Sequence, residues 1–228
     1  HNDFRRHLRN VPILILRPKM KKLASLAAIA ISILSANTAT ASSTGLYSNA
    51  CAKGLVQEIP ARRAKAPLGS AVMEQVLNLS GSERDTVVIE QVLSGNLPSF
   101  LRQLIPVTFA GTLADGQTAE VTICVTPDYL AVGNDKDFVR IPMGLPAAAL
   151  IADKFGFFLP TTKMVDAIYS QAGIRLAPSP MKPTSQMSST GYLLTHNDTV
   201  DGQLAPLGTS LEELTAGQKK DLVWGCPR

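Results

Sequence analysis

The clearest alternation of apolar and polar residues lies in the middle of the chain and predicts a β-hairpin. Residues 107–113 and 118–125 alternate, and the four residues between them are Ala-Asp-Gly-Gln. Asp-Gly between two such runs is a strong hairpin signal, because both central residues of a type I′ turn need positive φ. Two further short strands are predicted over 129–132 and 138–141. The strands therefore favour an antiparallel sheet built from hairpins.

Other segments repeat their apolar residues with helical spacing. Helices are predicted around 72–77, from 83, over 97–105, over 145–155 with Gly156 as C-cap, and from an N-cap at Thr161 to Gly173. The β-branched residues 86–89 leave a strand open in the second of these. Residues 178–190 are predicted as a loop, and the last forty residues are poorly periodic.

Because helices and strands are interspersed without strict alternation, the predicted fold class is α+β. We expect a single domain in which several helices pack on a hairpin-based antiparallel sheet. The predicted core contains Leu101, Leu104, Val121, Ile123, Ile151, Phe155, Val165 and Ile168.

The N-terminal region carries a tripartite export pattern that begins at Met20. Two lysines are followed by an apolar region over residues 23–34 and by Ala-Thr-Ala ending at Ala41. A bilayer core needs about 20 apolar residues, so the pattern predicts a cleaved signal peptide over 20–41; the alternative is an uncleaved membrane anchor. Residues 1–19 are predicted to be read-through upstream of the true start. We expect residues 42–228 to form a secreted or periplasmic domain with no stable membrane span after cleavage.

Removing the predicted leader reverses the sign of the net charge. The whole chain has 22 Lys+Arg against 18 Asp+Glu, a formal charge of +4. Residues 1–41 hold seven of these bases and one of the acids, which leaves 15 bases and 17 acids, or −2. The basic character therefore belongs to the leader, and the remaining domain offers no basic surface that would predict a nucleic-acid partner.

Three cysteines follow the leader, and export permits a disulfide between two of them. Cys51 and Cys226 lie near the two ends of the predicted domain, which often sit close together. Cys124 lies in an apolar strand and is interpreted as a buried thiol. Two accounts of the C-terminus stay open: a Cys51–Cys226 disulfide that anchors it, or a truncated chain, which we favour.

His196 is the only histidine after the leader, in Thr-His-Asn-Asp, and is the natural candidate for a general base. If this stretch is a strand, His196 and Asp198 share a face and the carboxylate orients the ring. On a helix, residues two apart diverge and the pairing fails. The alternative is a polar surface cluster in a loop.

Lys219 and Asp221 form a second candidate pair before an apolar run. A desolvated lysine beside an aspartate can act as a base or stabilise an oxyanion; the alternative is a charged entry to a last strand. The acidic turn 134–137, with Asp128 nearby, lacks the glycine and distant glutamate of a calcium loop and is interpreted as a solvated turn. The scattered cysteines give no zinc spacing, and no cofactor is predicted.

Two blocks of sequence carry a family resemblance. Residues 126–143 read Thr-Pro-Asp-Tyr-Leu-Ala-Val-Gly-Asn-Asp-Lys-Asp-Phe-Val-Arg-Ile-Pro-Met, and residues 159–168 read Leu-Pro-Thr-Thr-Lys-Met-Val-Asp-Ala-Ile. Together they resemble a group of uncharacterised secreted bacterial proteins, which implies an exported domain and names no activity. In that group a histidine is expected where Gln218 stands, and further chain is expected beyond Arg228.

These features lead to two functional hypotheses of different classes. The first is an extracytoplasmic hydrolase of an envelope or extracellular substrate, with His196 as base and Asp198, Lys219 or Asp221 assisting. The second is a non-catalytic binding or structural module of the periplasm or cell surface. A cleft that contains His196 and another ionisable group would favour the hydrolase.

Overall fold

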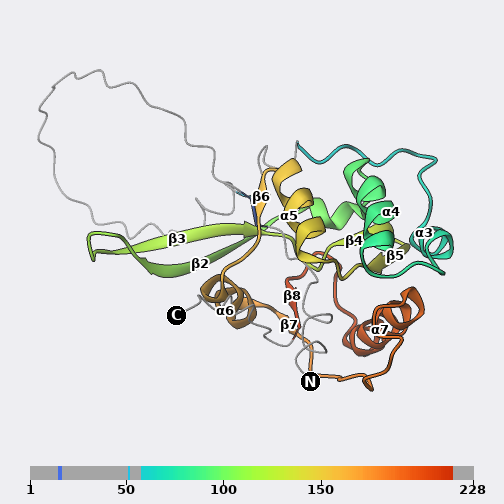
Figure 1. Cartoon of the computed structure of the whole chain (residues 1–228). Helices are drawn as coiled ribbons and strands as arrows, with labels where there is room; N and C mark the ends of the chain where they lie inside the picture. Colours follow the sequence, from blue (N-terminus) through green and yellow to red (C-terminus); the bar gives the residue numbers. More distant parts are fainter. Residues whose placement is uncertain (1–14, 17–50, 52–57, 218–228) are drawn as a thin grey trace, which may run out of the picture.

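The predicted hairpin is the longest β structure of the protein. The computed structural model describes residues 15–16, 51 and 58–217. β2 (Ile105–Thr112) pairs antiparallel with β3 (Thr118–Val125) along its whole length, from Ile105 opposite Val125 to Thr112 opposite Thr118. Figure 1 shows the tip of this hairpin extending beyond the helices, and the strand pairing confirms the predicted hairpin. The expected type I′ turn is wrong, because Gly116 has φ of +85° but Asp115 does not have positive φ.

The remaining strands are short. The sheet has the order β2-β3-β1-β6, where β1 is Ile15–Leu16 and β6 is Phe157–Phe158. β4 (Ala131–Asn134) and β5 (Asp137–Arg140) form a second hairpin, close to the predicted strands. β7 (Ile174–Arg175) and β8 (Thr215–Ala216) form a parallel pair.

Helices surround these strands and make the fold α+β, as predicted. The structure contains α3 (Gly69–Gln75), α4 (Gly81–Leu93), η1 (Ser99–Arg102), α5 (Leu145–Lys154), α6 (Thr162–Gln171), α7 (Thr190–Leu204) and η2 (Ala205–Leu207). Gly156 follows α5 with φ of +70°, and the Thr161 side chain accepts a hydrogen bond from the Met164 N–H at the start of α6. Both predicted helix ends are therefore confirmed. The β-branched residues 86–89 lie within α4.

One predicted helix is wrong. Residues 97–105 form the short η1 and the beginning of β2. The apolar spacing reflected burial, since Leu97, Leu101 and Leu104 are all buried. The irregular backbone is held by Arg102, whose guanidinium donates to the carbonyls of Leu97, Pro98, Gly95 and Pro60. Because these carbonyls already accept hydrogen bonds from Arg102, they do not require the hydrogen bonds of a helix.

The apolar interior has two main parts. One lies among α3, α4, α5 and β4, and the other lies between the β2–β3 hairpin and α6. Six of the eight predicted core residues are buried: Leu101, Leu104, Ile123, Ile151, Phe155 and Ile168. Val121 and Val165 are only half-buried, because the hairpin and α6 each expose part of their length.

A side chain of α6 covers one position on the outer edge of the sheet. β2 is an end strand, and Gln171 lies beside its Thr108. The Gln171 amide donates to the Thr108 carbonyl at 2.8 Å and accepts from the Thr108 N–H at 3.2 Å. One side-chain amide thus satisfies both backbone groups that a neighbouring strand would otherwise take.

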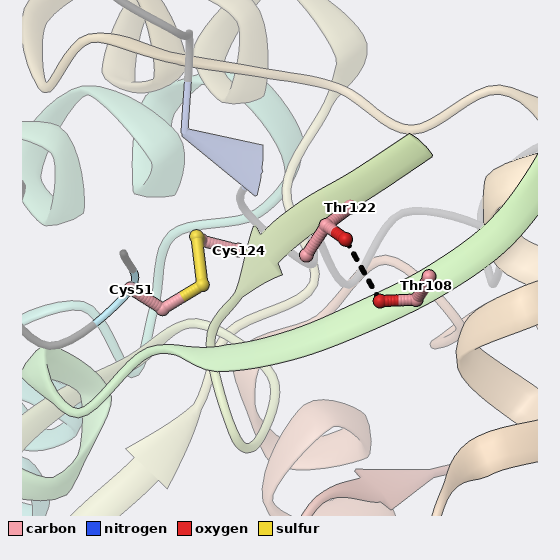
Figure 2. Close-up of a disulfide and its surroundings, with 4 residues drawn as sticks. All are labelled: Cys51, Thr108, Thr122 and Cys124. Atoms are coloured by element: carbon pink, nitrogen blue, oxygen red, sulfur yellow. Dashed lines mark hydrogen bonds between the residues drawn. A yellow bond between two sulfur atoms is a disulfide. The ribbon is translucent and has the colours of Figure 1, made fainter. Parts of the chain in front are cut away.

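The cysteine predictions are wrong in their pairing. Cys51 is bonded to Cys124, with Cα atoms 5.5 Å apart (Figure 2). Cys124 is therefore no free thiol, and Cys51 cannot anchor Cys226, which lies outside the described residues. Cys124 lies on β3 beside Thr122, whose hydroxyl is 2.8 Å from that of Thr108. The disulfide attaches Cys51 to the polar face of the hairpin.

The predicted boundaries of the signal peptide and of the exported domain remain predictions. β1 falls within the segment 1–19, whereas the predicted signal peptide, residues 20–41, lies outside the described residues. Among the helices of the described part, none is long and apolar enough to cross a membrane.

Candidate ligand-binding pocket

His196 lies in the middle of α7, so its predicted partnership with Asp198 is wrong. Residues two apart on a helix point in different directions, and the structure leaves Asp198 exposed while His196 is half-buried. The helix begins at an N-cap, Ser189, whose side chain accepts from the Tyr192 N–H. The other predicted pair, Lys219 and Asp221, lies outside the described residues and stays untested.

The side chain of His196 lines a pocket of about 470 Å³. Its walls come from the first half of α4, the beginning of α5 with the loop before it, the first half of α7 and the loop before that helix. Figure 1 shows α4, α5 and α7 in the same half of the molecule. Most of the wall is apolar: Ile89, Pro142, Met143, Pro146, Ala147, Leu150, Met187 and Leu193. This volume and composition are typical of a small-molecule site.

Two adjacent charged residues of α4 also line the pocket. Arg84 and Asp85 are each only 6% exposed. Arg84 donates from Nη1 to the Ser188 carbonyl at 3.1 Å, and Asp85 accepts the Gly144 N–H on Oδ2 at 2.8 Å. The pair thereby joins α4 to the loops that precede α5 and α7.

Each member of this pair has one buried polar atom without a hydrogen bond. These atoms are the Nε of Arg84 and the Oδ1 of Asp85, which lie 3.9 Å apart. That distance makes an ion pair but exceeds a hydrogen bond. Burial lowers the pKa of Arg84, and the charge of Asp85 partly opposes this. Both atoms have almost no accessible surface, so this unsatisfied donor and acceptor lie behind the pocket wall and not on its surface.

The N-terminal ends of two helices meet at the same pocket. Gly81 and Ser82 begin α4, and Gly144 is the N-cap of α5. Neither helix has a side-chain hydrogen bond from its N-cap residue. The first N–H groups of a helix lack partners within it and give that end a partial positive charge. The end of α5 lies against Asp85, whose Oδ2 accepts the Gly144 N–H, so this carboxylate meets the partial positive charge of that helix end.

A buried network behind α7 sets the position of the helix. Arg140, on β5, donates to Asp128 Oδ2 from Nη2 at 2.7 Å and to Asp201 Oδ1 from Nη1 at 2.6 Å. Asn197 accepts the Arg140 N–H and donates to Asp201 at 2.7 Å. Burial lowers the pKa of Arg140, but Asp128 and Asp201 outweigh it and raise the pKa. Because Asn197 follows His196, the network fixes the rotation of α7 about its axis.

The acidic turn considered for calcium has a different role. Asp137 accepts hydrogen bonds from the Ser70 N–H and hydroxyl at the start of α3, and Asp135 accepts from both groups of Ser99 at the start of η1. Across residues 58–217, no three His, Cys, Asp or Glu side chains are grouped to hold a metal ion. The carboxylates cap helices, where negative charge is favourable.

Tyr129, next to Asp128, gives a titration prediction. Its hydroxyl oxygen accepts the Gly217 N–H at 2.5 Å, and burial raises the pKa of its phenol to about 12. In an unfolded chain a tyrosine titrates near ~10. A raised folded-state pKa means that the neutral phenol stabilises the fold fully below pH ~10, and that this stability is lost as the pH rises through the folded pKa.

Ultraviolet absorbance should show one phenolate that forms only near pH 12, or at unfolding, and Tyr129→Phe should remove it. A normal titration of every tyrosine in the folded protein would contradict this.

Sequence reasoning found one pocket residue, His196, and missed Arg84 and Asp85. Charged residues in a helix are usually solvated, and only the pattern of burial on α4, where Val88 and Val92 are also buried, reveals that these two face inward. Arg84 and Asp85 precede Val88 by four and three residues, so they lie on the same helix face as Val88. This spacing was the signal available in the sequence.

Comparisons with known proteins identify no relative of this chain. No family model, no curated protein and no solved structure matches the chain. The resemblance to secreted bacterial proteins, and the exported location that it implies, therefore remain expectations.

Proposed function

We propose that this chain is an exported module that binds a small, largely apolar ligand in the pocket formed by α4, α5 and α7. The supporting observation is the pocket itself: apolar walls with a few convergent polar groups. Such a combination is typical of sites that fix a ligand by a few polar contacts and hold it by apolar burial. The predicted leader would place this ligand in the bacterial envelope or outside the cell.

An environment-sensitive apolar dye tests this proposal. Its fluorescence should rise and saturate on titration with the protein. Thr86 is exposed at the pocket rim, so Thr86→Trp should obstruct the entrance without altering the core, and we expect it to weaken dye binding about tenfold or more. Thr112→Trp, at an exposed position at the end of β2, is the matched control and should bind the dye normally. Absence of saturable binding, or equal binding by both variants, would reject the pocket as a ligand site.

Hydrolysis is a second candidate, favoured by the position of His196 in the wall of the same pocket as Ser82, Ser188 and Asp85. A histidine acting as general base contributes roughly 10²–10⁴ in rate. His196→Gln should therefore reduce cleavage of small chromogenic esters and amides by about that factor while leaving dye binding intact. Hydrolysis equal in the two proteins would remove His196 from any catalytic role.

A further inference from the structure

We propose that the exported form of this protein has a slot between β3 and β6 that binds an extended apolar segment of another chain as an added strand. The slot is bounded by Val125 on β3 and by Phe157 and Phe158 on β6, and it shares no residue with the pocket of α4, α5 and α7. The proposal rests on the expected export of residues 42–228 and not on ligand binding in the pocket. It is carried by the position of β1 in the sheet.

β1 lies between β3 and β6 and pairs antiparallel with both strands. Ile15 is opposite Val125 on one side and opposite Phe158 on the other, and Leu16 is opposite Phe157. The two residues of β1 therefore join a hairpin strand to a strand that follows α5.

The exported chain is expected to lack β1. Ile15–Leu16 precede Met20, where the predicted leader begins. Synthesis that starts at Met20 never includes β1, and cleavage after Ala41 removes it from a longer precursor. Neighbouring strands lie about 4.8 Å apart, so β3 and β6 then face each other across about 10 Å, the width of one missing strand.

Both walls of this slot are held by contacts that do not involve β1. β3 pairs with β2 along its whole length, and its Cys124 is crosslinked to Cys51, which belongs to the expected exported part. β6 packs against α5, and its Phe157 is buried in the same apolar cluster as Ile151 of that helix. A site with walls that are already positioned costs less to order when a partner binds.

The apolar surroundings of the slot determine which segments fit. Val125 lies in the cluster between the hairpin and α6, Phe157 lies in the other cluster, and both are fully buried. Successive residues of a strand face opposite sides of a sheet, so two consecutive residues of an added strand meet apolar neighbours. Strands buried on both faces are typically continuous apolar runs. The Ile-Leu-Ile-Leu run of residues 13–16 is such a sequence and shows the kind of segment that the slot accepts.

Another chain is the expected source of this strand. Among residues 58–217, β4 pairs with β5 and β7 pairs with β8, while β2 is fully paired with β3, so no described strand of the exported part is left to fill the slot. An added strand would form backbone hydrogen bonds with both walls, whereas an ordinary sheet edge offers bonds on one side only.

Binding of a fluorescent peptide by the exported protein tests the slot. The full chain is produced in an exporting bacterium and purified from the periplasm, and its intact mass identifies its N-terminus. A labelled peptide with the sequence of residues 11–17 should then bind saturably, as measured by fluorescence anisotropy. Peptides with Ile15→Asp, or with an N-methyl group on Leu16, should require about tenfold or higher concentrations. The first places a charge among apolar side chains, and the second removes a backbone donor.

Saturable binding of the unmodified peptide, with weaker binding of both modified peptides, supports the slot. Equal binding of the three peptides, or no saturable binding, overturns the inference, and the second result includes the case in which residues 218–228 of the chain fill the slot. A purified product that retains residues 1–19 overturns it as well, because β1 then stays in place. The peptide should leave dye binding in the pocket unchanged, so failure of the slot and failure of the proposed function are separate results.

A crosslink that depends on strand register tests the position of the peptide. Opposite residues of antiparallel strands have Cα atoms about 4.5–5.5 Å apart, a separation that suits a disulfide. In a Cys226→Ser background, Phe158→Cys should form a disulfide with a peptide that carries Ile15→Cys, and much less with one that carries Leu16→Cys. Thr112→Cys, at an exposed position at the end of β2, is the matched control and should form neither.

Intact mass measures this crosslink. Equal crosslinking of the two peptides, or of the two protein variants, would overturn the proposed position of the added strand. Circular dichroism establishes that each variant is folded, and the peptide series on the unaltered protein decides the inference if the Phe158→Cys protein is not.

Discussion

Replacing Arg140 by methionine is expected to lower the free energy of unfolding by about 3–5 kcal/mol. The side chains of Arg140 and Asp128 are 4% and 5% exposed, so the substitution leaves a buried carboxylate without its counter-charge. It also removes the donor to Asp201 that helps to hold α7. Methionine is similar in length and apolar, so the loss reflects the broken charge network rather than a cavity. Chemical denaturation monitored by circular dichroism measures the change.

Asp201→Asn provides the matched control for this prediction. The Asp201 side chain is 49% exposed, so its ion pair with Arg140 is partly screened by water. We expect a loss of about 1 kcal/mol or less for this substitution. The double variant Arg140→Met/Asp128→Leu should regain much of the stability that Arg140→Met loses, because no buried charge remains unpaired. Equal losses of unfolding free energy for Arg140→Met and Asp201→Asn would show that burial does not determine how much the network stabilises the fold.

Removing the disulfide is expected to have the second large effect. Cys51 and Cys124 are 73 residues apart, and the chain-entropy relation gives about 4 kcal/mol for a closed loop of that length. The Cys51→Ser/Cys124→Ser protein should therefore unfold at lower denaturant concentration, and reduction of the unaltered protein should have a similar effect. Cys226→Ser leaves this crosslink in place and should keep the original transition. A double variant as stable as the original would show that the crosslink contributes nothing to the stability of the fold.

The parts of the fold predicted correctly were those with local signals. The hairpin around Asp-Gly, the glycine after α5 and the threonine before α6 each depend on signals within a few residues, so the sequence alone could identify them. α7 was missed because its buried residues, including Thr190 and Asn197, mix polar with apolar. Their burial depends on Arg140 and on the carbonyl of Val76, which accepts from the Thr190 hydroxyl. A local sequence pattern contains no information about these contacts between distant parts of the chain.

The candidate site could be predicted only in part for the same reason. His196 was found because histidine chemistry makes that residue type a candidate wherever it occurs. Arg84 and Asp85 acquire their importance from Ser188 and Gly144, which lie 104 and 59 residues further along the chain. The Cys51–Cys124 pairing likewise depends on which strand the fold brings next to Cys51, and not on cysteine spacing.

The Gln171 side chain against β2 has a consequence for how copies of this protein behave in concentrated solution. An open strand edge is a template on which further chains can add and grow into fibrils. Here the backbone N–H and carbonyl of Thr108 are already bonded to the Gln171 amide, so a second molecule that approaches this edge cannot pair with them. The Gln171 side chain thereby reduces the number of free backbone groups on which a second copy could add a strand.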